Sequence, residues 1–199
     1  MYLKEPIKHT IVIEKSEFIC YLYPCKDVDE FKEFLNLVKK KHYDATHHCS
    51  AFISSDIKRS NDDGEPSGTA GMPILNALEK RGMLDTAAVV VRYFGGIKLG
   101  AGGLIRAYSK ATLEALDNAK IIDRINIHKF ELKVPYDISN KIDYYLRSNT
   151  KVIDTVYDID VKYIYLTNDD IIDKILEFTR GIKPSYLEDI MIDVDVKGV

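Results

Sequence analysis

The sequence has few cysteines, no long apolar run and no excess of charge of either sign. Its three cysteines, Cys20, Cys25 and Cys49, are odd in number and lack the spacing of metal ligands. They lie in or beside expected strands, which argues against a disulfide framework or a zinc site and favours a reducing compartment. No apolar stretch reaches the roughly eighteen residues that span a bilayer, and the N-terminus lacks a signal-peptide core. We therefore expect a soluble cytoplasmic protein with no membrane partner.

Charge is almost balanced along the chain. Residues 1–125 hold 18 Lys and Arg against 17 Asp and Glu, and residues 126–199 hold 10 against 14, for a net charge of -3. A chain with no strongly basic module cannot bind nucleic acid tightly through bulk electrostatics. Any RNA site must therefore be a local patch.

Common nucleotide-binding and catalytic motifs are also missing. No Gly-Lys-Ser/Thr completes a P-loop, and no G-x-G-x-x-G follows a strand. Ser67, Thr69 and Cys49 are nucleophile types, but sequence adjacency supplies none of them with a general base. We lean towards a protein that is not an enzyme.

Glycine, in contrast, is concentrated in two segments. Eight of the eleven glycines fall within residues 62–71 and 95–103. Glycine allows backbone conformations closed to other residues and close approach of amides to a ligand. The second segment follows an expected strand (85–94), and helical periodicity resumes at Leu104, so amides at a helix start would favour phosphate. The alternative is that the glycines only let helix and strand pack closely.

Candidate site residues follow from these two segments. Lys98 and Arg106 would add positive charge to the second segment. The candidate phosphate- or nucleic-acid-binding residues are Gly95, Gly96, Lys98, Gly100, Gly102, Gly103 and Arg106.

The first segment brings together the carboxylates of Asp62, Asp63 and Glu65. They suit Mg²⁺ or a positioned water, or else they form turns and cap a helix near Pro73. We expect no resident metal or other cofactor, with Mg²⁺ as the one alternative. Arg92 ends a buried strand and needs a partner, and one of the three carboxylates is a candidate if the segments converge. His47 and these four residues form the supporting set.

Hydrophobic periodicity predicts an α+β protein with domains at residues 1–124 and 125–199. The first domain is expected to contain strands at 7–14, 16–23, 48–54 and 85–94, helices beginning near Asp27, Pro73 and Leu104, and a polar loop at 54–65. The second is expected to follow the order βαββαβ, with strands at 126–134, 150–158, 160–167 and 185–196 and helices at 137–149 and 169–180.

Two long segments resemble the Impact/YigZ family. They are residues 62–75 (DDGEPSGTAGMPIL) and 88–108 (AVVVRYFGGIKLGAGGLIRAY), and His47 with Cys49 suits the strand that precedes them in the family. Ser67 stands where alanine is common. The resemblance covers the whole chain. It implies an Impact N-terminal domain of the ribosomal-protein-S5-domain-2-like fold and a C-terminal ferredoxin-like domain similar to one in elongation factor G.

The resemblance also implies a role in translation or its regulation through RNA binding, with no settled reaction. The leading hypothesis is a non-catalytic protein that binds RNA or a nucleotide phosphate, with a ribosome-associated component as a further partner. A metal-assisted phosphate-handling enzyme and a protein-interaction adaptor are the alternatives. The S5-like fold also underlies small-molecule kinases, which keeps the enzyme alternative open by analogy.

Overall fold

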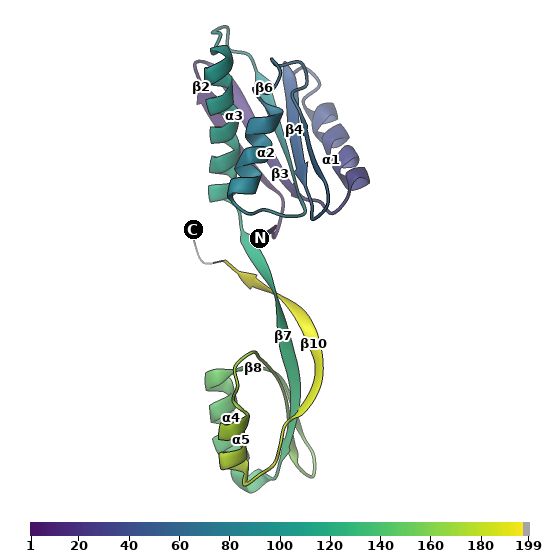
Figure 1. Ribbon diagram of the computed structural model, residues 1–199, viewed down its shortest axis with the longest axis vertical. Helices are drawn as coiled ribbons and strands as arrows, with labels where there is room; N and C mark the ends of the chain where they lie inside the picture. The colour runs from purple at the N-terminus through teal and green to yellow at the C-terminus, as the bar shows by residue number, and fades with distance from the viewer. Residues whose placement is uncertain (197–199) are drawn as a thin grey trace. The chain divides into compact units, whose positions relative to one another are not determined.

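A computed structural model describes residues 1–196, which form two compact units (Figure 1). The first unit comprises Met1–Asp123 together with residues 194–196, and the second comprises Arg124–Asp193. Two five-stranded sheets and five α-helices make up the secondary structure of these residues. The predicted α+β class is confirmed.

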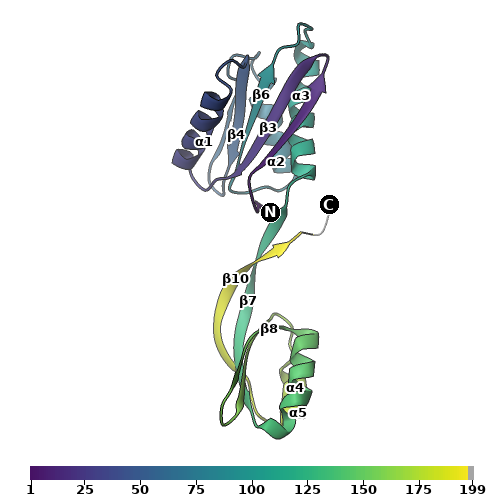
Figure 2. The same cartoon turned by 180° about the vertical axis from the view of Figure 1, so that it is seen from behind.

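The first unit is built on an antiparallel sheet with helices on both faces. Its strands and helices are β2 (Ile7–Ile13), β3 (Ser16–Pro24), α1 (Val28–Lys41), β4 (His47–Ile53), β5 (Lys58–Asn61), α2 (Gly71–Lys80), β6 (Thr86–Tyr93) and α3 (Gly100–Asp117). The strand order is β2-β3-β6-β4-β5. Figures 1 and 2 show α2 and α3 on one face of this sheet and α1 on the other.

The middle strand β6 is buried on both faces, as its run of alanine and valine predicts. Ala88 and Val90 belong to the core beneath α2 and α3. Val89 and Val91 belong to the core beneath α1. This central strand therefore holds its last residues, including Arg92, in a fixed position between the two layers.

Two boundaries near the first glycine segment differ from prediction. The predicted polar loop at 54–65 contains β5, an edge strand whose side chains are all exposed, so no apolar alternation marks it in the sequence. Helix α2 begins at Gly71 rather than near Pro73. A Cβ atom at Gly71 would lie 2.6 Å from the backbone nitrogen of Asn61, so glycine lets the start of α2 pack against the end of β5.

Helix α3 also begins earlier than predicted, at Gly100 instead of Leu104. Gly100, Gly102 and Gly103 therefore lie in the first turn of the helix and not in a loop before it. Glycine has a low helix propensity and no apolar side chain, so the apolar periodicity of the sequence does not reveal this first turn. The strand β6, the glycine segment and α3 meet in the order that the sequence predicts.

The second unit has its own core. Its elements are most of β7 (Ile121–Val134), α4 (Tyr136–Asn149), β8 (Lys151–Tyr157), β9 (Val161–Thr167), α5 (Ile172–Thr179) and most of β10 (Ser185–Asp195). The first residues of β7 and the last of β10 belong to the first unit. Strand β9 pairs with β7 and β8, and β10 pairs with β7. The short strand β1 (Tyr2–Leu3) pairs with the beginning of β7. Leu132, Ile142, Tyr163 and Ile175 lie in the buried cluster between the sheet and both helices.

Candidate functional site

Asp62 fastens the first glycine segment to the start of α2. Its carboxylate accepts hydrogen bonds from the backbone N–H groups of Gly68 at 2.8 Å, Ala70 at 3.0 Å and Gly71 at 2.8 Å. Burial acts to raise the pKa of the Asp62 carboxyl, but the three amides outweigh it and hold the pKa below its ordinary value. The predicted turn and helix-capping role is confirmed for this residue.

Asp63 connects α1 to β4. Its carboxylate accepts a hydrogen bond from Lys39 Nζ at 2.9 Å and one from the backbone N–H of His48 at 2.7 Å. Partial burial opposes ionisation, yet Lys39 and the His48 amide lower the pKa of Asp63 below its ordinary value. The Asp63 carbonyl oxygen lies 2.8 Å from His47 Nδ1.

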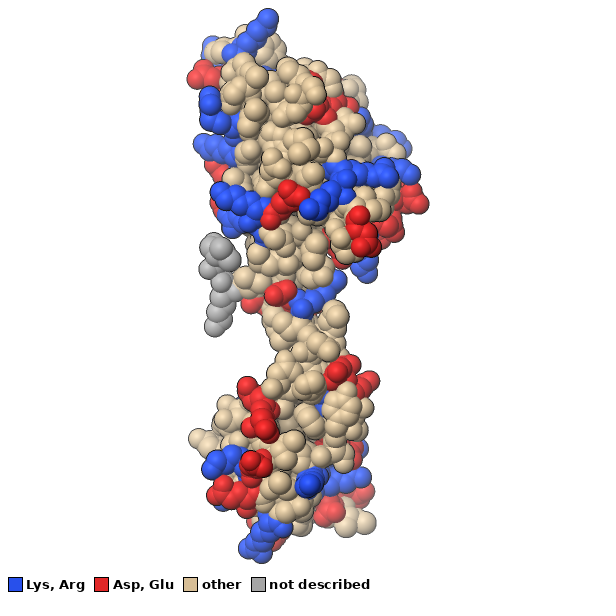
Figure 3. Space-filling view, in the orientation of Figure 1, with Lys and Arg blue, Asp and Glu red and all other residues tan. Residues whose placement is uncertain are grey.

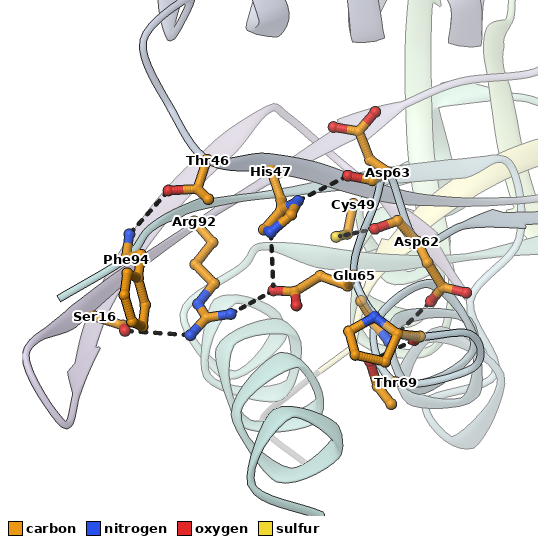
Figure 4. A network of polar contacts seen from close by, with 12 residues as sticks. Ser16, Thr46, His47, Cys49, Asp62, Asp63, Glu65, Thr69, Arg92 and Phe94 are labelled. Atoms are coloured by element: carbon orange, nitrogen blue, oxygen red, sulfur yellow. Dashed lines mark hydrogen bonds and ion pairs between the residues drawn. The ribbon is translucent and has the colours of Figure 1, made fainter. Parts of the chain in front are cut away.

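Glu65 is the partner of Arg92. Its Oε1 atom lies 2.6 Å from Arg92 Nη1, and the Tyr108 hydroxyl donates to the same oxygen at 2.8 Å (Figure 4). The side chains of Glu65 and Arg92 are 4% and 6% exposed. This pair ties the first glycine segment to the end of β6, as the sequence predicts for convergent segments.

The three carboxylates that the sequence places together thus have separate partners. Asp62 faces backbone amides, Asp63 faces α1 and β4, and Glu65 faces Arg92. Within residues 1–196, no group of three or more His, Cys, Asp or Glu side chains is arranged to hold a metal ion.

The orientation of His47 follows from its backbone contact. A carbonyl oxygen only accepts hydrogen bonds, so His47 Nδ1 carries the proton that it donates to Asp63 O. Its Nε2 atom lies 3.9 Å from Glu65 Oε1. Gly64, with a φ of +88°, packs against the edge of the imidazole ring. The ring therefore presents one nitrogen towards the ion pair.

Arg92 lies close to two aromatic rings. Its guanidinium carbon is 5.4 Å from the ring centroid of Phe18 and 5.4 Å from that of Phe94. Nη2 lies 3.5 Å from Ser16 Oγ, and Nε has no hydrogen-bond partner among the described residues. The arginine is therefore held in place but retains one unused donor.

Cys49 is buried on β4 below this network. Its Sγ atom lies 2.9 Å from the Asp62 carbonyl oxygen and 3.3 Å from the Tyr108 hydroxyl, and its single proton serves one of these at a time. Burial raises the pKa of the Cys49 thiol to about 12, and burial also raises the pKa of Tyr108. Neither group forms a reactive anion near neutral pH.

The second glycine segment contains glycines of two kinds. A Cβ atom at Gly95 would lie 2.0 Å from the Lys15 backbone, and one at Gly103 would lie 2.9 Å from Leu99 Cβ. These two glycines allow close packing. Gly96 and Gly100 have φ values of +88° and +67° and face open space. They are glycines because the backbone adopts a left-handed conformation at these positions.

A pocket of 360 Å³ lies between the end of β6, the first glycine segment and the start of α3. We call it the β6–α3 pocket. Its lining residues are Thr46, His47, Glu65, Pro66, Arg92, Phe94, Lys98, Leu99, Gly100, Ala101 and Leu104.

The β6–α3 pocket brings together only part of the predicted set. Lys98, Gly100, His47, Glu65 and Arg92 line it. The other candidates are absent from the lining: Gly95, Gly96, Gly102, Gly103, Arg106, Asp62 and Asp63.

Arg106 is exposed on α3 close to its own first turn, since a Cβ atom at Gly102 would lie 3.5 Å from Arg106 Nη1. Sequence reasoning missed Thr46 and Phe94. The available signal for Phe94 is an aromatic residue placed directly between a buried strand and a glycine pair.

The end of α3 that opens on the pocket has no cap. Among residues 1–196, no side-chain hydrogen bond caps its start, and its first turn contains no acidic residue. The positive end of the helix dipole therefore faces the pocket without local compensation. Lys98 adds a full positive charge, and no carboxylate is within ion-pair distance of it in the described chain. The arrangement suits an anion.

The chain is similar to several known proteins. Residues 14–116 match the Impact N-terminal domain family. The chain is 46% identical over 158 residues to the IMPACT family member YvyE of Bacillus subtilis (strain 168), covering 78% of this chain and 73% of that protein. It is 36% identical over 158 residues to the IMPACT family member YigZ of Escherichia coli (strain K12), covering 76% and 78%.

A solved structure, described as the crystal structure of a hypothetical protein, is similar over nearly the whole chain. It matches with a TM-score of 0.61 and 32% sequence identity, covering 94% of this chain and 96% of that one. In the described residues, no helix has the length and apolar character needed to cross a membrane. The family match includes both glycine segments, and together with the two bacterial relatives it shows that the chain belongs to the IMPACT family.

Proposed function

We propose that this protein is a non-catalytic RNA-binding protein that acts in translation or its regulation and holds an RNA phosphate in the β6–α3 pocket. One observation carries the proposal: the uncapped start of α3 opens, beside Lys98, on a pocket that Arg92 also lines. Unsatisfied amides, a helix dipole and a lysine together form a phosphate site. The link to translation rests on the family resemblance.

The charge distribution supports a local contact with RNA at the pocket and not a broad electrostatic surface. Glu65 neutralises Arg92, so the pocket keeps a positive charge from Lys98 and the partial charge of the helix end. Figure 3 shows Lys and Arg side chains on both sides of the first unit, interspersed with Asp and Glu, and both signs mixed on the second. RNA affinity should therefore fall as the salt concentration rises. The slope of log affinity against log salt concentration should be shallow, because few phosphates are neutralised.

The geometry favours binding over catalysis. Asp62, Asp63 and Glu65 already have protein partners, and the neutral Cys49 thiol is no nucleophile near neutral pH. The metal-assisted enzyme therefore has less support than the binding protein. We further propose that the first unit has the ribosomal-protein-S5-domain-2-like fold. The order β7, α4, β8, β9, α5, β10 supports a ferredoxin-like fold for the second.

The second unit offers a surface for a ribosomal or protein partner. The hairpin between β8 and β9 exposes Tyr157 at 66% and Ile159 at 88%. Large apolar side chains on a hairpin tip are typical of contact surfaces. No observation favours an adaptor role without RNA.

A fluorescence titration of the full chain tests the proposal. Single-stranded and structured RNA are titrated at low and near-physiological salt, with ATP, GTP and Mg²⁺ in parallel. We expect RNA binding that Lys98→Gln weakens about three- to tenfold, with a salt slope reduced by roughly one.

Arg106→Gln is the matched control because it removes one positive charge from the same helix outside the pocket. It should weaken binding by less than about twofold. Equal losses in the two variants would refute the pocket as the phosphate site. Absence of RNA binding by the wild-type chain, with saturable nucleotide binding instead, would favour the enzyme alternative.

A further inference from the structure

Phe94 is an exposed aromatic residue on a rigid backbone. Its side chain is 45% exposed although it directly follows the buried strand β6. Its backbone N–H donates a hydrogen bond to Thr46 Oγ1 at 3.1 Å. The next residue, Gly95, packs so closely on the Lys15 backbone that no side chain fits there. The ring is therefore held in the open by its neighbours on both sides.

A charged group lies close to the Phe94 ring. Figure 4 shows Arg92 beside Phe94, and the guanidinium carbon lies 5.4 Å from the ring centroid. The ring centroid of the buried Phe18 also lies 5.4 Å from this carbon. Phe94 is 45% exposed, whereas Phe18 is buried, so the exposed part of the Phe94 ring is available to a further planar group. An exposed aromatic ring is a stacking surface for such a group.

The pocket that Phe94 lines also contains groups for a phosphate. The start of α3 and Lys98 lie on its wall, as does Arg92, whose side chain is 94% buried and whose Nε has no partner in the described chain. Its volume of 360 Å³ lies near the lower end of ligand pockets, which suits a single nucleotide and is too small for a duplex. Stacking surface and anion site therefore share one small space.

We propose that the β6–α3 pocket takes one unpaired nucleotide of RNA, with its base stacked on Phe94 and its phosphate at the first turn of α3. This inference rests on the proposed function and adds the class of RNA. Bases in a duplex already stack on their neighbours, so only a single-stranded or bulged nucleotide offers a free face. The protein therefore selects single-stranded RNA. Stacking alone gives little preference among bases, because each base has a π-face.

Three substitutions at Phe94 separate stacking from simple apolar contact. Phe94→Leu keeps an apolar side chain but removes the ring, and Phe94→Tyr keeps the ring. We expect Phe94→Leu to weaken binding of a single-stranded oligoribonucleotide about tenfold, and Phe94→Tyr to stay within about twofold of wild type. Binding of the same sequence as a blunt duplex should be weaker from the start and should change by less than about twofold in either variant. Thermal unfolding of each variant checks that the fold is intact.

The third substitution, Phe94→Trp, detects the contact directly. The chain contains no tryptophan, so the introduced indole is the sole one and is excited selectively at the red edge of the aromatic absorption. A base stacked on the indole quenches its fluorescence, whereas a phosphate bound nearby leaves most of it unchanged. We expect saturable quenching by single-stranded RNA and no saturable quenching by the duplex or by inorganic phosphate.

Four results decide the inference. Single-strand preference, the loss in Phe94→Leu and quenching in Phe94→Trp together support it. Equal binding of single-stranded and duplex RNA, with Phe94→Leu unaffected but Lys98→Gln weakened, overturns the stacked nucleotide and leaves the phosphate site standing. A loss in both Phe94→Leu and Phe94→Tyr without quenching also overturns it. No binding of either RNA by the wild-type chain overturns this inference together with the proposed function.

Discussion

Glu65 Oε1 lies 2.6 Å from Arg92 Nη1, and both side chains are almost completely buried. The pair joins the first glycine segment to the end of β6, and both of its side chains line the β6–α3 pocket. A buried charge without a partner is strongly destabilising, because it has lost its hydration and gained no opposite charge in exchange. The pocket therefore depends on an interaction between residues that are 27 positions apart in the chain.

Glu65→Ala should strongly destabilise the first unit. The substitution leaves Arg92 buried and uncompensated and removes the acceptor of the Tyr108 hydroxyl, which predicts a loss of about 3–5 kcal/mol in the free energy of unfolding. Urea denaturation monitored by circular dichroism measures it. Glu79→Ala, which breaks an exposed pair with Lys58, is the matched control and should cost about 1 kcal/mol or less. A similar cost for the two variants would contradict the importance of the buried pair.

Asp62→Asn should destabilise the first unit in a pH-dependent way. The folded pKa of Asp62 lies below the ordinary value of 3.8, so the ionised carboxylate stabilises the fold above that pH, and this contribution is lost as pH falls through the folded pKa. At pH 7 we expect Asp62→Asn to cost about 1–3 kcal/mol, because charged acceptors of backbone N–H bonds are strong.

The measurement for Asp62 is denaturation of wild type and variant between pH 7 and pH 2. The difference between them should shrink below pH 3.8. Asp56→Asn removes an exposed aspartate from the connection between β4 and β5 and should change stability by less than about 0.5 kcal/mol over this range. A difference for Asp62→Asn that stays constant over the range would contradict the role of its charge.

Gly95→Ala and Gly102→Ala should change stability in opposite directions. A Cβ atom at Gly95 would collide with the Lys15 backbone, so we expect a loss of about 2 kcal/mol or more. A Cβ atom at Gly102 would meet only the end of the Arg106 side chain, at 3.5 Å, and alanine favours the helix by about 0.5–1 kcal/mol. Thermal unfolding of the two variants distinguishes them, and a stable Gly95→Ala protein would show that the β2–β3 turn can move.

The cysteine thiols should be unreactive in the folded protein. Cys20, Cys25 and Cys49 are all fully buried, and burial raises the pKa of each to about 12. Reaction with a disulfide reagent at pH 8 should be at least about a hundredfold slower than in urea, where thiols regain a pKa near 8.5. Absorbance kinetics measure both rates, and three thiols should react after unfolding. Rapid labelling of a native thiol would show that part of the first unit opens easily.

The strongest sequence signals concern chemistry and local order. The apolar run in β6 predicts a strand that is buried on both faces. The apolar spacing after Asp27 predicts α1, which Asp27 caps by accepting from the Asp29 and Glu30 amides at 2.9 Å. A buried arginine next to an acidic segment predicts an ion pair. The strand and the helix depend on residues that are close in sequence. The ion pair follows from the general rule that a buried charge needs a partner.

Other features escaped the sequence because they have no local signature. The edge strand β5 contains only polar, exposed side chains, so its pairing with β4 is its only distinguishing feature. The first turn of α3 is glycine-rich, so its helical state comes from its place after β6 and not from propensity.

The sequence by itself determined the α+β class, the family segments and the residue types at the site. Only the tertiary structure decided which residues meet. It assigned Glu65 to Arg92, turned Asp62 and Asp63 towards other partners, and placed Lys98 on the pocket wall and Arg106 outside it. The physical reason is that side-chain direction depends on helix phase and strand register, whereas residue type records only what a side chain can do.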